Sequence, residues 1–219
     1  MPIRVVISDF GGVLTTPLIG SFMAFQDRTG IAGESLGAAM QRIYERDGKH
    51  PLYELEKGHM TEDEFLTTMR AELAVDLGHE PEMHGFKDIY FEALEPNLPM
   101  VHEMREAKRA GQRMALLTNN VREWEPLWRS MLPVDEIFEL VVDSAFVGMR
   151  KPEPEIYRLT LERLRAHDPG ELGELEFGEC LFVDDVEVNC TAARELDINV
   201  VHFRDNEQAI AELRAALAP

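Results

Sequence analysis

Short apolar runs alternate with amphipathic stretches over the second half of the chain, and this pattern predicts strands and helices in turn. Strands are expected at about residues 113–117, 140–142, 180–183 and 198–203. Helices are expected at about residues 98–110, 121–131, 154–167, 187–196 and 207–217. Regular strand–helix alternation of this kind indicates a parallel sheet whose strands are joined by right-handed helical crossovers.

The first apolar run, residues 3–8, predicts a further strand close to the first residue. This strand must join the same sheet, because a strand standing alone cannot bury both of its faces. Residues 18–94 instead show apolar positions at helical spacing and contain no convincing strand. We therefore expect a Rossmann-like α/β core formed by residues 1–17 and 95–219, with residues 18–94 inserted as a helical cap. A cap placed directly after the first strand would cover a site at the end of that strand.

The amino-acid composition and the net charge limit which kinds of molecule this protein is expected to bind. The 219 residues are enough for one large domain or for a core with a smaller insert. Lysine and arginine total 22 against 41 aspartate and glutamate residues, which gives a net charge of −19. Such a field repels nucleic acid and anionic membrane surfaces, so we expect neither as a partner. It says little about an active site, which can be locally cationic or can hold a metal ion.

The chain also carries signals about its compartment. Its two cysteines, Cys180 and Cys190, do not form a disulfide framework, which favours a reducing cytoplasm. No N-terminal segment combines a basic start, an apolar stretch and a cleavage site. No apolar run approaches the roughly 18–20 residues that a membrane span requires. We expect a cytoplasmic protein, and the sequence gives no indication of its oligomeric state.

Asp9 stands directly after the first predicted strand, and Gly11 and Gly12 follow it. Open α/β sheets bind their ligands at the carboxyl ends of their strands, where Asp9 would lie. Glycines allow backbone N–H groups to approach an anion closely. A carboxylate nucleophile facing such amides is the arrangement that an aspartyl-phosphate enzyme needs. Taken alone, however, the same residues would also fit a turn with a capping aspartate.

Two further segments carry groups suited to phosphate. Thr118 and Asn119 end the second strand, and a hydroxyl and an amide there can hydrogen-bond phosphoryl oxygens. Lys151 precedes a helix that starts at a proline, where it can serve as a fixed cation. Each of these residues has an ordinary alternative, a polar helix start for Thr118 and a surface position for Lys151.

Asp184 and Asp185 follow the strand at residues 180–183, and Asn189 stands four residues further on. Two carboxylates at the mouth of an apolar strand repel each other unless a cation lies between them. Carboxylate oxygens are hard ligands that suit Mg²⁺. Helix capping by one of the two aspartates is the alternative, and it leaves the other unexplained.

The order of these residues resembles that of the haloacid dehalogenase-like (HAD) hydrolase superfamily over nearly the whole chain. Asp9 matches the family's nucleophile, Thr118 its second motif, Lys151 its third and Asp184-Asp185 its acidic fourth. Residues 151–157 and 182–189 resemble the helical-cap subgroup that includes the N-terminal phosphatase domain of soluble epoxide hydrolase and bacterial sugar-phosphate phosphatases. The position of the insert is similar to that of the family's cap.

The resemblance implies Mg²⁺-dependent hydrolysis of a small phosphorylated molecule, a phosphate monoester, through an aspartyl-phosphate on Asp9. It implies that Mg²⁺ is held by Asp9, the backbone carbonyl of Gly11 and Asp185, with Asp184 ligating through water or orienting the site and Asn189 supporting it. It further implies that the phosphoryl oxygens are held by Lys151, Thr118, Asn119 and the amides near Gly11 and Gly12.

Position 11 departs from the family pattern. Most HAD phosphatases carry there a second aspartate that protonates the leaving alcohol and later activates water, whereas this chain has Gly11. We consider first a weak or specialised phosphatase, restricted to good leaving groups or borrowing a cap residue such as Glu56 or His59. A phosphate-binding or regulatory module without catalysis is the second alternative. A 2-haloacid dehalogenase is third, because the family's dehalogenases lack that aspartate but work without metal and do not usually show the Asp-Asp pair. The sequence does not identify the substrate.

Overall fold

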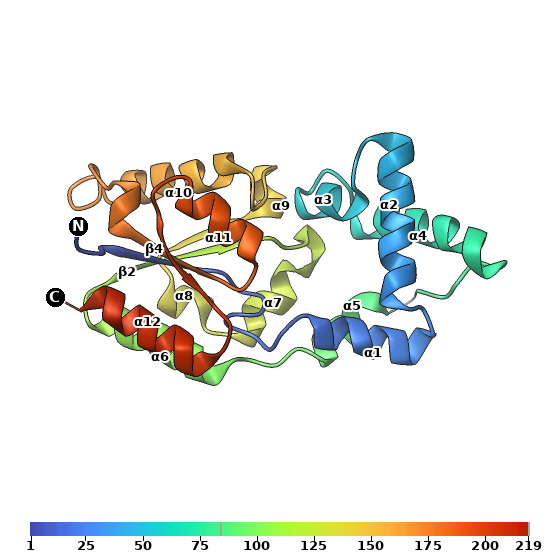
Figure 1. The fold of residues 1–219 in the computed structure, drawn as a ribbon, viewed down its shortest axis with the longest axis horizontal. Helices are drawn as coiled ribbons and strands as arrows, with labels where there is room; N and C mark the ends of the chain where they lie inside the picture. Colours follow the sequence, from blue (N-terminus) through green and yellow to red (C-terminus); the bar gives the residue numbers. More distant parts are fainter. Residues whose placement is uncertain (84, 219) are drawn as a thin grey trace.

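The computed structural model describes residues 1–83 and 85–218, and its centre is a five-stranded parallel sheet of order β3-β2-β1-β4-β5. Figure 1 shows helices on both sides of this sheet. The strands are β1 (Val5–Ser8), β2 (Arg113–Thr118), β3 (Leu140–Asp143), β4 (Cys180–Asp184) and β5 (Asn199–His202). The Rossmann-like parallel sheet expected from the alternating pattern is confirmed, and β1 takes the central position in it.

Both faces of the sheet are buried under helices. Successive side chains of a strand point to opposite faces, so each strand contributes to two hydrophobic clusters. On β1, Val6 packs into one hydrophobic cluster, whereas Val5 and Ile7 pack into the other. The helices α10 (Pro154–His167) and α11 (Glu187–Arg194) cover one face, and α6 (Leu98–Arg109) and α12 (Asn206–Leu217) cover the other (Figure 1). These four helices agree with the predicted ones to within one or two residues.

Other connections of the core are less regular than the sequence predicted. The helix expected at residues 121–131 is divided into a 3₁₀ turn, Arg122–Trp124, and the helix α7 (Glu125–Met131). Two four-residue helices, α8 (Val134–Ile137) and α9 (Ser144–Val147), were not predicted, and a further 3₁₀ turn covers Phe177–Glu179. Segments of three or four residues are too short to show a helical period.

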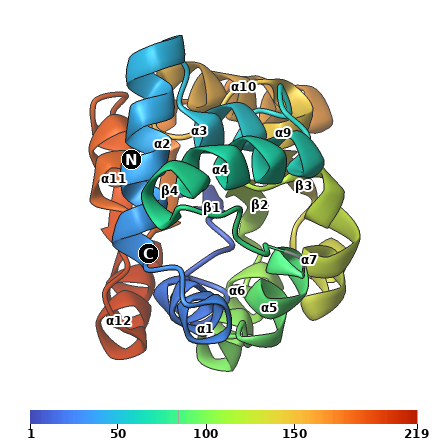
Figure 2. The same ribbon diagram turned by 90° about the vertical axis from the view of Figure 1, so that its right-hand side faces the viewer.

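The cap is helical, as its sequence predicted, and among residues 18–83 and 85–94 the structure has no strand. Its helices are α1 (Ile19–Thr29), α2 (Gly33–Asp47), α3 (Pro51–Glu56), α4 (Glu62–Leu77) and α5 (Phe86–Glu92). They lie together at one end of the molecule, with both termini at the other end (Figures 1 and 2). The domain limits of residues 17 and 95 stay a prediction, and residues 84 and 219 lie outside the described residues.

The two segments that join the cap to the core run side by side. Thr15 forms an antiparallel bridge with Pro96, and the amide of Asn97 donates to the carbonyl of Leu14 at 2.8 Å. No helix in the described part of the chain is long and apolar enough to cross a membrane.

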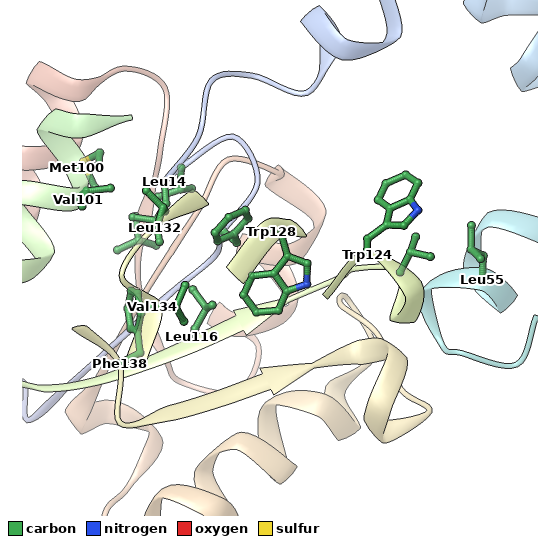
Figure 3. Packing of buried hydrophobic residues seen from close by; sticks show 14 of the residues in the cluster. Leu14, Leu55, Met100, Val101, Leu116, Trp124, Trp128, Leu132, Val134 and Phe138 are labelled. Atoms are coloured by element: carbon green, nitrogen blue, oxygen red, sulfur yellow. The ribbon is translucent and has the colours of Figure 1, made fainter. Parts of the chain in front are cut away.

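Aromatic side chains pack the cap against the core. The Trp124 ring lies 5.0 Å from that of Tyr90 and 5.5 Å from that of Phe91, both on α5. Trp128 lies deeper, with its ring 5.2 Å from Phe10 beside the end of β1. Figure 3 shows Trp124 between Trp128 and the cap residue Leu55. Trp124 therefore packs against the cap and Trp128 against the end of β1, although the two tryptophans stand only four residues apart.

Candidate active site

Lys151 draws two carboxylates together at the carboxyl ends of the central strands. Its ammonium Nζ lies 2.7 Å from Asp9 Oδ1 and 2.6 Å from Asp184 Oδ2. The pairing of Ser8 with Val183 places the ends of β1 and β4 next to each other, so Asp9 and Asp184 are neighbours. All three charged side chains are buried, and Lys151 is only 1% exposed. The surface position considered for Lys151 is thereby excluded.

The main chain of Lys151 is held by Asn119 at the end of β2. The Asn119 side-chain amide donates to the Lys151 carbonyl, and its oxygen accepts from the Lys151 amide, both at 2.9 Å. This reciprocal pair fixes the loop that carries the lysine. It also engages both polar groups of the Asn119 carboxamide and leaves one N–H of the side-chain amide for a further contact. The assignment of Asn119 to phosphate stays a prediction.

Asp184 accepts hydrogen bonds on both of its oxygens. Besides Lys151, it accepts from the Asn189 side chain at 3.1 and 3.2 Å and from the Val186 amide at 2.8 Å. Tyr157 donates to the Asn189 carbonyl at 3.0 Å, which anchors that residue in turn. Charge-assisted bonds of this kind hold a buried carboxylate in one orientation. Asp184 therefore fixes the position of the Lys151 ammonium, and Asn189 fixes the orientation of Asp184.

The donor set at this edge of the sheet fits a hard divalent cation. Asp9, Asp184 and Asp185 each offer a carboxylate oxygen, and these atoms lie within 4.8 Å of one another. Gly12 leaves room for Asp185, since a Cβ atom at position 12 would lie 2.2 Å from Asp185 Oδ2. Three carboxylates also outnumber the single ammonium of Lys151. Oxygen-only ligands and excess negative charge are what Mg²⁺ requires.

Burial dominates the electrostatics of the site. It raises the pKa of Asp9 to about 7, against the opposing attraction of Lys151. It also raises the pKa of Asp185, and the neighbouring charge of Asp184 adds to this effect. Burial disfavours the charged form of Lys151, but Asp184 and Asp9 outweigh it and raise the lysine's pKa. The lysine therefore stays a cation beside Asp9, whose carboxylate form burial disfavours.

A cavity of about 840 Å³ opens beside this cluster, between the core and the cap. Gly11, Thr118 and Asn119 form part of its wall at the core side. Most of the remaining wall is apolar and comes from cap helices, with Phe22, Met40, Leu55, Met69, Phe86 and Tyr90 among the lining residues. Three of the residues predicted from the sequence, Gly11, Thr118 and Asn119, therefore lie at the core side of an apolar cavity.

Sequence reasoning missed the contacts that the cap makes with this edge. Arg150 Nε donates to Glu56 Oε2 of α3 at 2.6 Å, and its guanidinium lies over the Tyr53 ring at 3.9 Å. Ser144 donates to the Glu56 carbonyl at 2.6 Å and accepts from the amide of Asn120 at 3.0 Å. Nothing in the local pattern around Ser144 or Arg150 indicates a partner in the cap.

The comparison with protein families matches residues 3–197 to a hydrolase family, the haloacid dehalogenase-like hydrolases. The chain belongs to this family. The family membership and the parallel-sheet fold that the resemblance implied are both confirmed.

Relatives and solved structures agree with this placement. Bifunctional epoxide hydrolase 2 of Rattus norvegicus is 26% identical over 97% of this chain, and the chain spans 38% of that protein. A sesquiterpene phosphatase of Aspergillus oryzae is 28% identical over 55% of this chain and 57% of its own length. A HAD family enzyme of Bacteroides thetaiotaomicron, solved with magnesium and inorganic phosphate, has a TM-score of 0.63 at 22% identity, covering 92% of this chain and 94% of that chain.

Proposed function

We propose that this HAD-family hydrolase is a Mg²⁺-dependent phosphatase that cleaves phosphate monoesters through an aspartyl-phosphate on Asp9. The observation that carries the proposal is the cluster of Asp9, Lys151, Asp184 and Asp185 beside the glycine turn. Placed at the end of the central strand, it offers a nucleophile, a fixed cation and a set of oxygen ligands. The solved HAD enzyme with magnesium and phosphate supports the same cofactor.

In the proposed reaction, the nucleophile, the lysine and the metal ligands act in different ways. Asp9 attacks phosphorus and displaces the alcohol, and water then hydrolyses the acyl phosphate to release phosphate and free Asp9. Lys151 holds Asp9 in place and, with Thr118 and the amides near Gly12, holds the phosphoryl oxygens. Asp9, Asp185 and the carbonyl of Gly11 would hold Mg²⁺, which when bound neutralises charge on the phosphoryl group. Catalysis then consists chiefly of positioning and charge neutralisation.

The cavity favours an apolar alcohol as the esterified part of the substrate. A sugar phosphate would leave hydroxyl groups facing the side chains of Phe22, Met69 and Phe86, where few hydrogen-bond partners are available. A hydrocarbon body would instead bury apolar surface, at about 25 cal/mol per Å². The relative named as a sesquiterpene phosphatase supports this choice. We propose such a phosphorylated small molecule as the partner and the cytoplasm as the compartment.

The test is turnover of a panel of phosphate monoesters that pairs alkyl esters of increasing length with sugar esters, each measured with Mg²⁺ and with chelator. We expect Mg²⁺-dependent release of phosphate, a higher kcat/KM for the longer alkyl esters, and loss of turnover in Asp9→Asn. Asp47→Asn is the matched control, because Asp47 is exposed and pairs with Arg46 on the cap surface. Turnover in Asp9→Asn equal to that of the wild-type protein would refute the proposal.

Gly11 favours one other function, a phosphate-binding module without catalysis. Such a module would bind a non-hydrolysable phosphonate tightly and would release no phosphate from any ester of the panel. The dehalogenase alternative predicts halide release from short 2-haloacids without metal. Steady release of phosphate would exclude the first of these alternatives, and absence of halide release would exclude the second.

A further inference from the structure

The phosphatase proposed above lacks a proton donor at position 11, and the structure shows what occupies that place. A Cβ atom on Gly11 would lie 3.2 Å from Cδ1 of Leu18, at the start of the cap. An apolar side chain therefore covers the spot from which the family's second aspartate would act. If the alcohol leaves with a proton, another residue that faces the cavity must supply it.

Among the described residues, two acidic side chains of the cap line the cavity, Glu34 and Glu56. Glu34 is exposed, whereas Glu56, at the C-terminal end of α3, contacts the core through Arg150 and Ser144. It lines the cavity together with Gly11 and Thr118. Tyr90 also lines the cavity, and burial raises its pKa, with smaller contributions from the charges of Glu56, Asp9 and Asp185. The ammonium of Lys151 in turn acts on Glu56.

The carboxyl group of Glu56 is held at one oxygen and open at the other. Oε2 accepts from Arg150, and the carbonyl of Glu56 accepts from Ser144. In the described part of the chain, no group donates a hydrogen bond to Oε1. The residue is thus fixed to the core through its backbone and through one oxygen, which leaves the second oxygen for a ligand. Burial raises the pKa of Glu56, whereas Arg150 opposes that rise.

His59, the other cap residue considered for this part, faces elsewhere. Its Nδ1 lies 3.5 Å from Glu54 Oε2, its side chain is half exposed, and it is absent from the cavity wall. Its Nε2 lies 3.5 Å from the point where a Cβ on Gly148 would stand. The two candidates therefore separate on geometry, and Glu56 is the one that lines the cavity beside Gly11 and Thr118.

We propose that Glu56 is the general acid and base of this enzyme, supplied by the cap in place of a residue at position 11; this inference rests on the proposed phosphatase activity. As Asp9 attacks phosphorus and the P–O bond to the alcohol breaks, the proton on Glu56 passes to the leaving oxygen. The Glu56 carboxylate then takes a proton from the water that attacks the aspartyl-phosphate. Phosphate and Asp9 are released, and Glu56 is again protonated. Proton transfer of this kind contributes about 10²–10⁴-fold to the rate.

Glu56→Gln tests the assignment, since glutamine can still accept from Arg150 but cannot donate a carboxylic proton. Two substrates are compared, hexyl phosphate, whose alkoxide needs a proton to leave, and 4-nitrophenyl phosphate, whose phenolate does not. We expect kcat/KM for hexyl phosphate to fall about 10²–10⁴-fold, and kcat/KM for the nitrophenyl ester to change by less than about tenfold. Because the water step also loses its base, nitrophenol should appear in a burst of one equivalent per enzyme.

The control is Glu54→Gln on the same helix, which should leave both kcat/KM values near those of the wild-type protein. Glu56→Asp is measured beside these variants and, if Glu56→Gln fails to fold, takes its place, with a smaller loss expected on the alkyl ester alone. An equal fall of kcat/KM on both esters, or steady turnover without a burst, would overturn the assignment.

The outcomes separate this inference from the function on which it depends. A wild-type protein inactive on both esters would refute the phosphatase proposal and Glu56 with it. A wild-type protein that loses activity in Asp9→Asn, but whose ratio between the two esters is unchanged in Glu56→Gln, would refute Glu56 alone.

Discussion

The ammonium of Lys151 lies 2.7 Å from Asp9 Oδ1, although the two residues stand far apart in the sequence. Lys151 also contacts Asp184 at 2.6 Å and is almost completely buried. Burial raises the pKa of Asp9, and the lysine opposes that rise. The availability of the proposed nucleophile as a carboxylate therefore depends on this one cation and on any metal bound nearby.

Lys151→Met should remove activity and destabilise the fold, because it leaves two buried carboxylates without their cation. Breaking a buried ion pair on one side costs about 3–5 kcal/mol. We expect a loss of that order in the free energy of unfolding, measured by urea denaturation in chelator, and no detectable phosphate release. Lys57→Met is the control, because the Lys57–Glu153 pair is partly exposed and should contribute less than about 1 kcal/mol. Equal losses in the two variants would contradict the role given to Lys151.

Gly12→Ala should weaken the response to Mg²⁺ through Asp185. The new Cβ would lie 2.2 Å from Asp185 Oδ2, and Gly12 has a φ of +77°. Gly30→Ala is a matched control, because Gly30 has a φ of +74° and open space around it. Both variants should lose about 1–2 kcal/mol from left-handed backbone strain. Only Gly12→Ala should raise the Mg²⁺ concentration for half-maximal activity, by about 10–100-fold. The same Mg²⁺ response in both variants would show that Asp185 does not hold the ion.

Gly58→Ala should disturb the contact between cap and core. A Cβ there would lie 2.2 Å from the Ala145 carbonyl oxygen, so α3 would have to move away from α9. Gly48→Ala offers the same backbone conformation, with φ of +69° against +67°, and no neighbouring atom. We expect Gly58→Ala to lower kcat/KM by about 10–100-fold, since small misplacements of positioning groups cost that much. Gly48→Ala should retain wild-type kcat/KM, and a similar loss in both variants would mean that this contact has no part in catalysis.

Asp143 should make the stability of the fold depend on pH. Burial raises its pKa to about 6, and the hydrogen bond from the Ala145 amide only partly opposes this. The folded state therefore binds the proton more tightly than the unfolded chain does. Its contribution is fully present below about pH 4 and is lost as the pH rises through about 6.

Asp143→Asn should remove that dependence. Relative to the wild-type protein, the variant should gain roughly 3 kcal/mol of unfolding free energy between pH 4 and pH 8. Urea denaturation at several pH values measures the difference. Asp47→Asn, at an exposed position where Arg46 lowers the pKa, should show no such gain. A difference between variant and wild-type protein that stays constant with pH would contradict the buried-carboxyl account.

Much of the secondary structure of the core could be predicted, because it depends on residues that are close together in the sequence. Apolar runs such as residues 180–183 mark buried strands, and Pro154 marks the start of a helix that the structure places at the same residue. The short helix α9 could not be predicted, because four residues show no period. The interpretation of Lys151 needed its neighbours in space, since a lone lysine in a sequence has no visible partner.

The sequence by itself indicated the strands, the helical character of residues 18–94 and which polar residues follow each strand. Parallel strands bring their carboxyl ends to one edge of a sheet, so those polar residues were expected to lie close together. Only the tertiary structure decided what the cap contributes. The contact of Glu56 with Arg150, the cover of Leu18 over Gly11 and the apolar cavity all depend on how helices distant in sequence pack together. Packing of this kind follows from the shapes of whole surfaces, and no spacing along the chain encodes it.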